Sequence, residues 1–358
     1  MSRYYFYRLY KSLPAIAVTL ITGFLFVNIG LISNYGSYFS NKNHFYVTME
    51  SILVFFCIEA FAFAYLEFSS FRNKRNLDTW FSFPLSREKI AIVHMLNVLT
   101  IYCVQMAIFT ANGVLLILAC DGVNMLYFFP AMLSCGIFGF LLFCFASCTF
   151  LFGNSVFDGV VSIFAWVNIP SSISTAITYI RAVATQRYEV FFEDNINLSA
   201  FRGITALNQY LEYMMNRSVY KKIARDFDMN YFYMNDYKHV NTEDWVSLAI
   251  WLVLFVVAAV AVPYVFSKRP SEKIGGISDF ILCYDLIIPF YLVFLFIVAG
   301  DIIQLKLFFV IAAYIAYAIY RKSPNITIKR FVIIGVFLVL AFIPFYDLLG
   351  VDTARGLL

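Results

Sequence analysis

The sequence has few charged residues, and this scarcity excludes an ordinary soluble globular protein. Charged side chains make up 13% of the 358 residues and apolar side chains 62%, whereas soluble domains carry about 25% charged residues. The chain also lacks a phosphate-binding loop of the form G-x-x-x-x-G-K-[ST], so we do not expect it to hydrolyse ATP itself. The zinc-protease pattern H-E-x-x-H and the serine-hydrolase pattern G-x-S-x-G are missing as well. The sequence therefore predicts no catalytic residues, no metal and no cofactor of its own.

Charge and cysteine placement exclude two further classes of protein. The net charge of +4 is too small and too dispersed to indicate a nucleic-acid partner. The seven cysteines lie in or beside apolar runs, whereas disulfide frameworks occupy water-exposed segments. We expect them to be free, packed thiols.

What the sequence does contain is a series of long apolar runs. About 20 apolar residues are needed to cross roughly 30 Å of hydrocarbon, and nine runs approach or exceed that length. They cover 13–33, 47–68, 90–118, 126–152, 156–180, 245–266, 280–299, 302–320 and 331–349. The last three are shorter, and one of them is a candidate for a re-entrant or interfacial segment. The sequence predicts an all-α polytopic membrane protein with about eight or nine transmembrane helices, and its 41 Phe and 25 Tyr suit contact with membrane lipid.

Basic residues indicate the orientation of the chain. Cytoplasmic segments of membrane proteins are enriched in Lys and Arg, and a cytoplasmic N-terminus would place fifteen of the 26 basic residues inside. These are Arg3, Arg8, Lys11, Arg72, Lys74, Arg75, Arg87, Lys89, Lys268, Arg269, Lys273, Arg321, Lys322, Lys329 and Arg330. We therefore expect a multi-pass membrane protein whose N-terminus is cytoplasmic and whose C-terminus lies outside if all nine runs span.

The only long polar stretch, 181–244, falls on the outer side in this orientation. It divides the chain into an N-terminal part with five runs (1–180), an extracellular loop (181–244) and a C-terminal part (245–358). Apolar residues at helical spacing predict a short amphipathic helix within the loop. They are Leu207, Tyr210, Leu211, Met214 and Met215. The loop either folds as a cap over the outer ends of the spans or binds a substrate or partner.

Polar residues inside the apolar runs are candidates for lining a cavity. Glu59 lies in the middle of the second run, where a charged side chain costs roughly 3 kcal/mol. It either faces a transport cavity or is hydrogen-bonded to a neighbouring helix through Asn97 or Gln105. Asn168 and Pro170 interrupt the fifth run, where they form either a gate or a simple helix kink.

Residues 69–89, which we call the coupling segment, combine apolar and charged side chains between two apolar runs. Its apolar residues are Trp80, Phe81, Phe83 and Leu85, and its charged residues include Arg72, Arg75, Asp78, Arg87 and Glu88. Buried anchors together with charged contacts are typical of a segment held by a soluble partner. An interfacial amphipathic helix without a partner is the alternative.

Within the coupling segment, residues 77–89 read LDTWFSFPLSREK. This stretch resembles the pattern (V/L)D-x-x-x-S-L-P-(I/L/V)-x-R-(E/K) of ABC-2-type exporter permeases, notably those of low-GC Gram-positive bacteria, with Phe83 in place of Leu. Residues 269–275 resemble the R-x-x-E-x-A-G segment of the same subfamily, with Ile274 in place of Ala. Residues 347–350 are similar to its D-L-x-G motif.

The resemblance implies a function that this chain performs only with partners. It implies a permease subunit in a bacterial cell membrane, paired with a second permease chain and coupled to separate ABC ATPase subunits that bind ATP. The coupling segment would contact the ATPase, and Arg269, Glu272 and Lys273 would form a secondary contact. Residues 4–10 would form an interfacial helix before the first span. An amphipathic peptide, lipid or drug is the class of substrate that we expect.

Two other functions remain open on the sequence alone. The chain could be an integral-membrane enzyme acting on lipid, with Glu59 or Asp158 as a base. It could also be a membrane sensor that binds a ligand through residues 181–244.

Overall fold

The computed structural model is helical in most of the residues that it describes. These are residues 2–37, 40–72, 85–118, 123–185, 201–226, 242–268, 278, 280–321 and 327–343. Within them, seven helices are long and apolar enough to cross a bilayer. Each of the nine predicted apolar runs overlaps a helix. The predicted all-α polytopic fold is therefore confirmed.

The seven candidate spans are followed by two further apolar helices. The spans are formed by α1 (Ser2–Gly30), α2 (Glu50–Phe68), α4 (Arg87–Leu118), α5 (Phe128–Phe150), α6 (Val156–Thr185), α9 (Thr242–Lys268) and α10 (Leu286–Ala299). The seventh span also includes the irregular turn η6 (Ile281–Asp285), which precedes α10. The further helices are α11 (Ile303–Arg321) and α12 (Ile328–Ala341). The 14 residues of α12 would cover only about 21 Å at 1.5 Å per residue.

Contrary to expectation, the N-terminal residues do not form a helix separate from the first span. No break separates residues 4–10 from the first span, because α1 is continuous from Ser2 to Gly30 and includes Pro14. The first turns of α1 are held against other helices, since Tyr4 and Arg8 are buried and bonded to them. The predicted interfacial helix is thus the beginning of α1.

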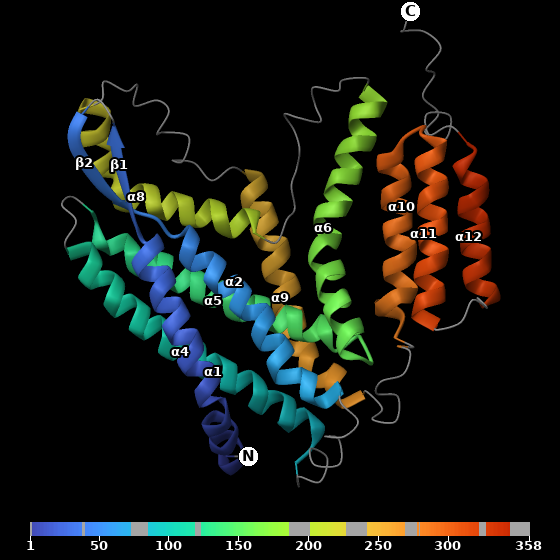
Figure 1. The fold of residues 1–358 in the computed structure, drawn as a ribbon, viewed down its shortest axis with the longest axis horizontal. Helices are drawn as coiled ribbons and strands as arrows, with labels where there is room; N and C mark the ends of the chain where they lie inside the picture. The colour runs from blue at the N-terminus through green and yellow to red at the C-terminus, as the bar shows by residue number, and fades with distance from the viewer. Residues whose placement is uncertain are drawn as a thin grey trace, which may run out of the picture. The chain divides into compact units, whose positions relative to one another are not determined.

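A short hairpin connects α1 to α2. Strand β1 (Ile32–Ser37) pairs antiparallel with β2 (Ser40–Val47), with Ile32 opposite Val47 and a register shift at Gly36 and Ser37. The helix α8 (Arg202–Asp226) packs beside β2 (Figure 1). The sequence had not indicated these strands.

The chain forms two compact units, which are described separately. Unit 1 comprises residues 1–151 and 201–269, and unit 2 comprises 152–200 and 270–358. In unit 1, α2 packs along α5, α1 packs along α4, and α9 contacts both α4 and α5 (Figure 1). Its core is aromatic: the rings of Phe56 and Tyr102 stack at 5.5 Å. In this grouping α6 belongs with the C-terminal helices and α9 with the N-terminal ones.

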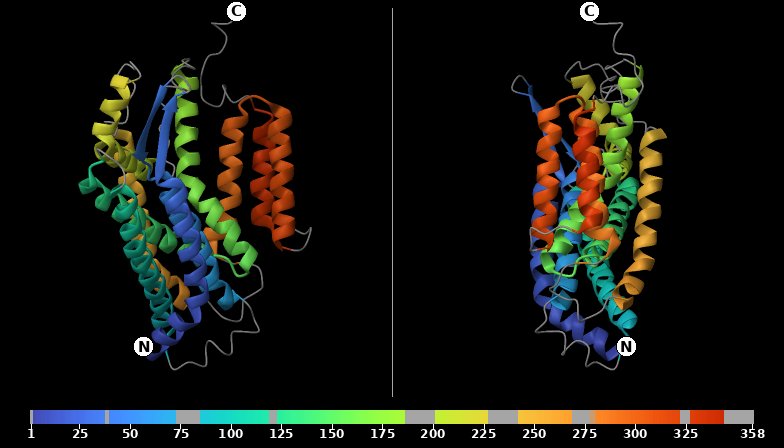
Figure 2. Two further views of the ribbon diagram at one scale, coloured as in Figure 1. Left: turned by 60° about the vertical axis from the view of Figure 1, so that its left-hand side comes forward. Right: turned by 90° about the vertical axis from the view of Figure 1, so that its right-hand side faces the viewer.

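Unit 2 contains α6, α10, α11 and α12. The last three lie side by side (Figure 2) around a core that includes Leu292, Phe296 and Tyr317. Gly300 joins α10 to α11 with a φ of 54°, a conformation that side chains other than glycine's disfavour. The α6 helix continues through Pro170. In the preceding turns of α6, the Ala165 carbonyl accepts a hydrogen bond of 2.8 Å from the Tyr291 hydroxyl of α10.

Candidate functional site

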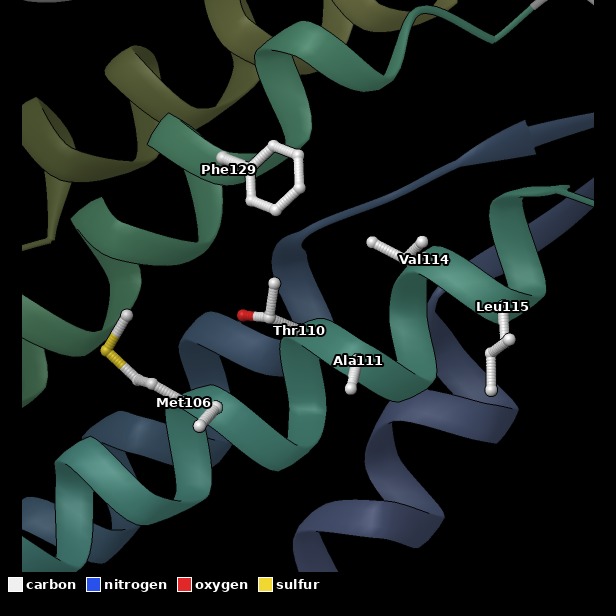
Figure 3. Close-up of a pocket in the computed structure, with 7 residues that line it drawn as sticks. Met106, Thr110, Ala111, Val114, Leu115 and Phe129 are labelled. Atoms are coloured by element: carbon white, nitrogen blue, oxygen red, sulfur yellow. The ribbon is translucent and has the colours of Figure 1, made fainter.

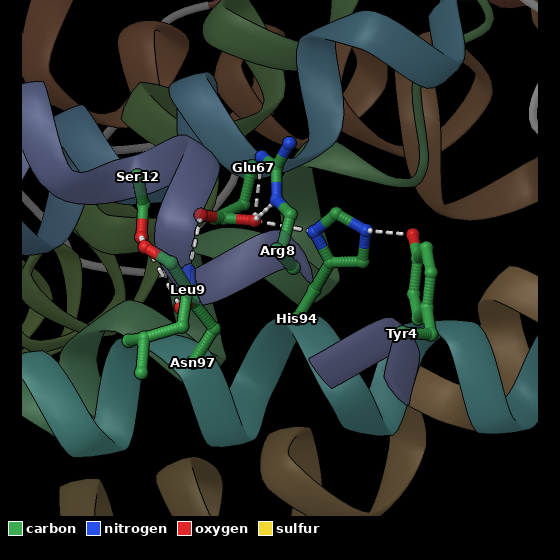
Figure 4. Close-up of polar contacts among 7 residues, drawn as sticks. All are labelled: Tyr4, Arg8, Leu9, Ser12, Glu67, His94 and Asn97. Atoms are coloured by element: carbon green, nitrogen blue, oxygen red, sulfur yellow. Dashed lines mark hydrogen bonds and ion pairs between the residues drawn. The ribbon is translucent and has the colours of Figure 1, made fainter. Parts of the chain in front are cut away.

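The most extensive polar arrangement among the described residues is buried in unit 1, where α1, α2 and α4 meet. We call it the polar cluster. It comprises Tyr4, Arg8, Ser12, Glu67, His94 and Asn97 (Figure 4). Each of the three helices contributes at least one member, so the cluster joins segments that lie far apart in the sequence.

Glu67 is the centre of the polar cluster. Its Oε2 atom accepts hydrogen bonds from Arg8 Nε at 3.0 Å and from Arg8 Nη2 at 2.8 Å. The same oxygen contacts His94 Nδ1, while Oε1 accepts a bond of 3.0 Å from Asn97 Nδ2. Both carboxylate oxygens are therefore occupied, and the carboxylate is paired with a guanidinium as a buried charge requires.

The remaining members extend the polar cluster along α1. The Tyr4 hydroxyl lies 3.1 Å from His94 Nε2. The single hydrogen of the Ser12 hydroxyl is shared between the Leu9 carbonyl, 2.8 Å from Oγ, and Asn97 Oδ1, 3.3 Å from Oγ. Since His94 is fully buried and has a partner on each ring nitrogen, its ring orientation is fixed by the network.

This geometry is suited to holding helices together. A buried ion pair is costly to break, because removing one partner leaves an uncompensated charge. The ring of Phe71 packs edge-on against His94, with centroids 5.1 Å apart, and also contacts Phe266 of α9. The polar cluster thus fixes α1, α2 and α4 to one another and, through Phe71, contacts α9.

Glu59 belongs to a smaller polar group further along the same helices. Gln105 Nε2 donates to Glu59 Oε1, and to Thr19 Oγ1 at 2.8 Å. The side chain of Glu59 is buried, with 3% of its surface exposed. Of the two alternatives raised by the sequence, the structure shows the hydrogen bond to a neighbouring helix, through Gln105. Asn97, the other suggested partner, is bonded to Glu67 instead.

Arg72, the first predicted coupling residue, is buried. It ends η1 (Ser69–Arg72), the short helix that follows α2. Only 6% of its surface is exposed, and its Nη2 donates a 2.7 Å hydrogen bond to the carbonyl of Leu151, the C-cap residue that follows α5. A cation at a helix C-terminus interacts favourably with the helix dipole. Arg72 therefore fixes the beginning of the coupling segment to α5.

The far end of the coupling segment is fixed by the start of α4. Ser86 precedes the helix, and its Oγ accepts a weak bond of 3.4 Å from the Lys89 N–H, which is the geometry of an N-terminal cap. Leu85 and Arg87 are half-buried, whereas Glu88 is exposed in the first turn. Arg87 and Glu88 are thus accessible at the edge of the helix.

The other predicted contact residues lie outside the described residues. They are Arg75, Asp78, Trp80, Phe81 and Phe83 in the coupling segment, and Arg269, Glu272 and Lys273 in the secondary segment.

The predicted gate residues lie on α6 of unit 2. Asn168 is exposed, and its side chain donates a 2.8 Å bond to the Phe164 carbonyl in the same helix. Pro170 is half-buried within the continuous helix. Asp158, at the start of α6, accepts a 2.9 Å hydrogen bond from Tyr284.

An apolar groove runs along α4 beside the start of α5 (Figure 3). Its volume is about 670 Å³. It is lined by Met106, Ala107, Thr110, Ala111, Val114, Leu115 and Phe129. Leu115 and Phe129 are more than half exposed, as is usual for side chains that face lipid.

The α8 helix packs against β2, α5 and α9 of unit 1. Asn216 Oδ1 accepts from the Val47 N–H at 2.9 Å, and Asn216 Nδ2 donates to the Val47 carbonyl at 2.7 Å. Arg202 Nε donates to Asp244 Oδ1 at 2.7 Å, which joins the start of α8 to the start of α9. The predicted helix over 207–215 is confirmed, although its most buried residues include Asn208 and Asn216.

Glu212 links α8 to the beginning of α2. Its Oε2 accepts a 3.1 Å hydrogen bond from the Met49 N–H. Burial raises the pKa of Glu212 to about 7, the Met49 N–H opposes this rise, and the nearby Glu50 carboxylate adds to it. The contact between α8 and α2 therefore contains a group that titrates near neutral pH.

Comparisons with known proteins do not assign the chain to a family. No family model, curated protein or solved structure matches it. The identification must therefore rest on the chain's own residues.

Among the described residues, no group of three His, Cys, Asp or Glu side chains is placed to hold a metal ion.

Sequence reasoning did not find the polar cluster, although a signal for it was present. Glu67, His94 and Asn97 each lie in or at the end of an apolar run, where ionisable side chains almost always pair with one another. Arg8 was considered only as a basic residue of the inner side and as part of the interfacial stretch 4–10. Its pairing with Glu67 depends on how α1 lies against α2, which the sequence does not state.

Proposed function

We propose that this chain is the membrane-spanning permease subunit of an ABC-2-type exporter. In this function it would bind separate ABC ATPase subunits through the coupling segment and pair with a second permease chain. The N-terminus would be cytoplasmic, in a bacterial cell membrane. ATP would be bound by the partner, and an amphipathic peptide, lipid or drug would be moved by a change between conformations of the permeases.

The observation that carries the proposal is the motif in residues 77–89, together with the way its flanks are anchored. A segment that transmits force from a soluble motor must be fixed at both ends, because a loosely attached loop would absorb the movement. Arg72 fixes one end to α5, and the Ser86 cap fixes the other end to α4. These contacts support a mechanical function for the segment.

The polar cluster supports the same interpretation. Glu67 lies just before η1, and His94 and Asn97 lie in the first turns of α4, so both helices that flank the coupling segment contribute to it. A displacement of the coupling segment would then move α2 and α4 as one body, with α1 attached through Arg8. In this proposal Arg72 positions the segment, whereas Arg87 and Glu88 are accessible for contact with the partner.

Affinity purification tests the proposal directly. The intact chain is expressed in a Gram-positive bacterium, purified in mild detergent and compared with the variant Phe81→Asp/Phe83→Asp/Arg87→Glu. A matched control, Tyr231→Asp/Phe232→Asp/Lys238→Glu, introduces the same charges into the long loop. We expect an ATP-binding protein to co-purify with the intact chain and with the control and to be lost from the coupling variant.

The other outcomes are equally informative. If the coupling variant retains the ATPase, the segment is not the contact. If no ATPase is recovered with the intact chain, even after crosslinking in cells, the exporter proposal is wrong.

A further inference from the structure

A pocket between α8 and the segment before α5 has the composition of an anion-binding site. Its volume is about 350 Å³. It is lined by Asn124, Tyr127, Met214, Met215, Arg217, Ser218 and Lys221. Arg217 and Lys221 lie one helical turn apart on α8, and neither forms an ion pair with any residue that the structure describes. Two like charges at this spacing repel each other, so a bound anion would relieve an existing repulsion.

The position of Asn124 provides a neutral donor beside these cations. Its Oδ1 atom accepts a 3.1 Å hydrogen bond from the Leu126 N–H, which leaves the amide NH₂ group to point elsewhere. Its own N–H donates a 2.8 Å bond to the Met215 carbonyl, so the segment is fixed to α8. The pocket therefore presents an amide donor and two cations on a connected frame, a combination that suits the several oxygens of a phosphate.

The pocket also lies at the level where a membrane-spanning segment begins. Tyr127 ends η2 (Met125–Tyr127), the turn at the start of the candidate span Met125–Phe150. Tyrosine is enriched at this depth, where lipid headgroups lie. Two residues further on, Phe129 lines the apolar groove on α4 (Figure 3). Residues 124–129 thus contribute to a cationic pocket and to an apolar groove.

We propose that Arg217, Lys221 and Asn124 bind a phosphate group at the membrane surface. The phosphate group would belong either to the headgroup of an anionic phospholipid or to a free phosphate ion. The site does not depend on the exporter proposal, because it is formed by α8 and residues 124–127 alone and needs no ATPase. It would give the long loop a binding function in addition to its function as a cap.

Binding is measured with the full chain in nanodiscs or detergent. The first probe is phosphatidylglycerol, compared with phosphatidylcholine, and bound lipid is counted by native mass spectrometry. The second probe is inorganic phosphate, whose binding is followed by the shift in the unfolding midpoint. The test variant is Arg217→Gln/Lys221→Gln, and the control is Lys222→Gln, which removes a neighbouring charge that does not line the pocket.

We expect selective binding of the anionic probe by the intact chain and by Lys222→Gln. The double variant should bind on the order of tenfold more weakly or worse, because two charge-assisted contacts are lost. Retention of phosphatidylglycerol without a response to inorganic phosphate identifies a lipid headgroup as the ligand, and the reverse identifies a free ion. Equal binding by the intact chain and the double variant overturns the proposal. An equal loss in Lys222→Gln also overturns it, since that result would indicate general surface charge. Correct folding of each variant is checked by its unfolding midpoint without probe.

Discussion

At the scale of single residues, Glu67 is the centre of the polar cluster. Its two oxygens accept bonds from Arg8 and Asn97 and contact His94, all in a buried setting. Replacing Glu67 with Gln would leave the Arg8 guanidinium buried without a counter-charge. We expect a loss of about 3 kcal/mol in the free energy of unfolding, near the lower end of the range for a broken buried ion pair.

The buried cysteines offer a way to measure this loss. Cys57, Cys135 and Cys144 are free and buried, so a thiol-reactive dye reports unfolding in detergent. The control is Glu88→Gln, at an exposed position on α4, which should leave the unfolding midpoint unchanged. A double variant, Arg8→Met/Glu67→Met, should be less destabilised than the sum of its single changes, since it removes both charges together. Additive effects would show that the ion pair is not what stabilises this region.

At the scale of elements, the contact between α8 and α9 depends on a glycine. A Cβ atom at Gly203 would lie 2.7 Å from the backbone nitrogen of Leu248, and backbone cannot move aside as a side chain can. Gly203→Ala should therefore force the two helices apart and destabilise unit 1 by about 1–3 kcal/mol. The matched control is Gly335→Ala in α12, where nothing lies within 4 Å of the added atom.

The control should be neutral or slightly stabilising, because alanine favours the helix over glycine by up to about 1 kcal/mol. Both variants are compared with the intact chain by the dye assay. If Gly203→Ala is as stable as Gly335→Ala, the close approach of α8 to α9 is not tight in the protein.

The attachment of α8 to α2 should depend on pH through Glu212. Its pKa is raised to about 7 in the folded chain from an ordinary value of 4.5, so the docked helix favours the neutral carboxyl. The stabilising contribution is complete below pH 4.5 and is lost as the pH rises through about 7. Hydrogen exchange of the α8 backbone should be faster at pH 8.5 than at pH 5.5, after correction for the intrinsic pH dependence of exchange.

The variant Glu212→Gln tests the assignment of this effect. Glutamine keeps an oxygen for the Met49 N–H but does not titrate, so the corrected exchange rates at the two pH values should become equal. A pH dependence that persists in Glu212→Gln would have to come from another group.

The elements themselves were largely predictable, whereas their contacts were not. Long apolar runs such as 90–118 leave a helix as the only way to satisfy the backbone in lipid, and α4 follows that run closely. The amphipathic spacing of Leu207 and Leu211 indicated α8 in the same way. By contrast, β1 and β2 lie in a polar stretch without a strong strand pattern.

The candidate site could be predicted only in part, because it depends on distances between helices. Glu59 was recognisable as a buried carboxylate, and Gln105 was one of two suggested partners. Arg72 belongs to a charged segment, and its burial against Leu151 follows from the position of α5, which local sequence does not encode. The pairing of Arg8 with Glu67 has the same origin.

At the scale of the whole molecule, each unit is consistent with a chain that crosses the membrane repeatedly. In unit 1 the polar cluster brings the start of α1, the end of α2 and the start of α4 to one end. The hairpin, α8 and the start of α2 meet at the other end. In unit 2, Tyr284 bonds to Asp158 and Arg330 bonds to Asp285 at 2.9 Å, so α6, η6 and α12 begin at one end.

Because unit 1 has two distinct ends, the accessibility of each end to a reagent outside the cell tests the orientation proposed from the basic residues. The native cysteines are first replaced by serine. A single cysteine is then introduced either at Ser86, before α4, or at Arg217, on α8. Neither position lies within a candidate membrane span. With a cytoplasmic N-terminus, a membrane-impermeant thiol reagent should label Arg217→Cys on intact cells. It should label Ser86→Cys only after the cells are permeabilised. Labelling in the opposite pattern would reverse the orientation and place the coupling segment outside the cell, where no ATPase could reach it.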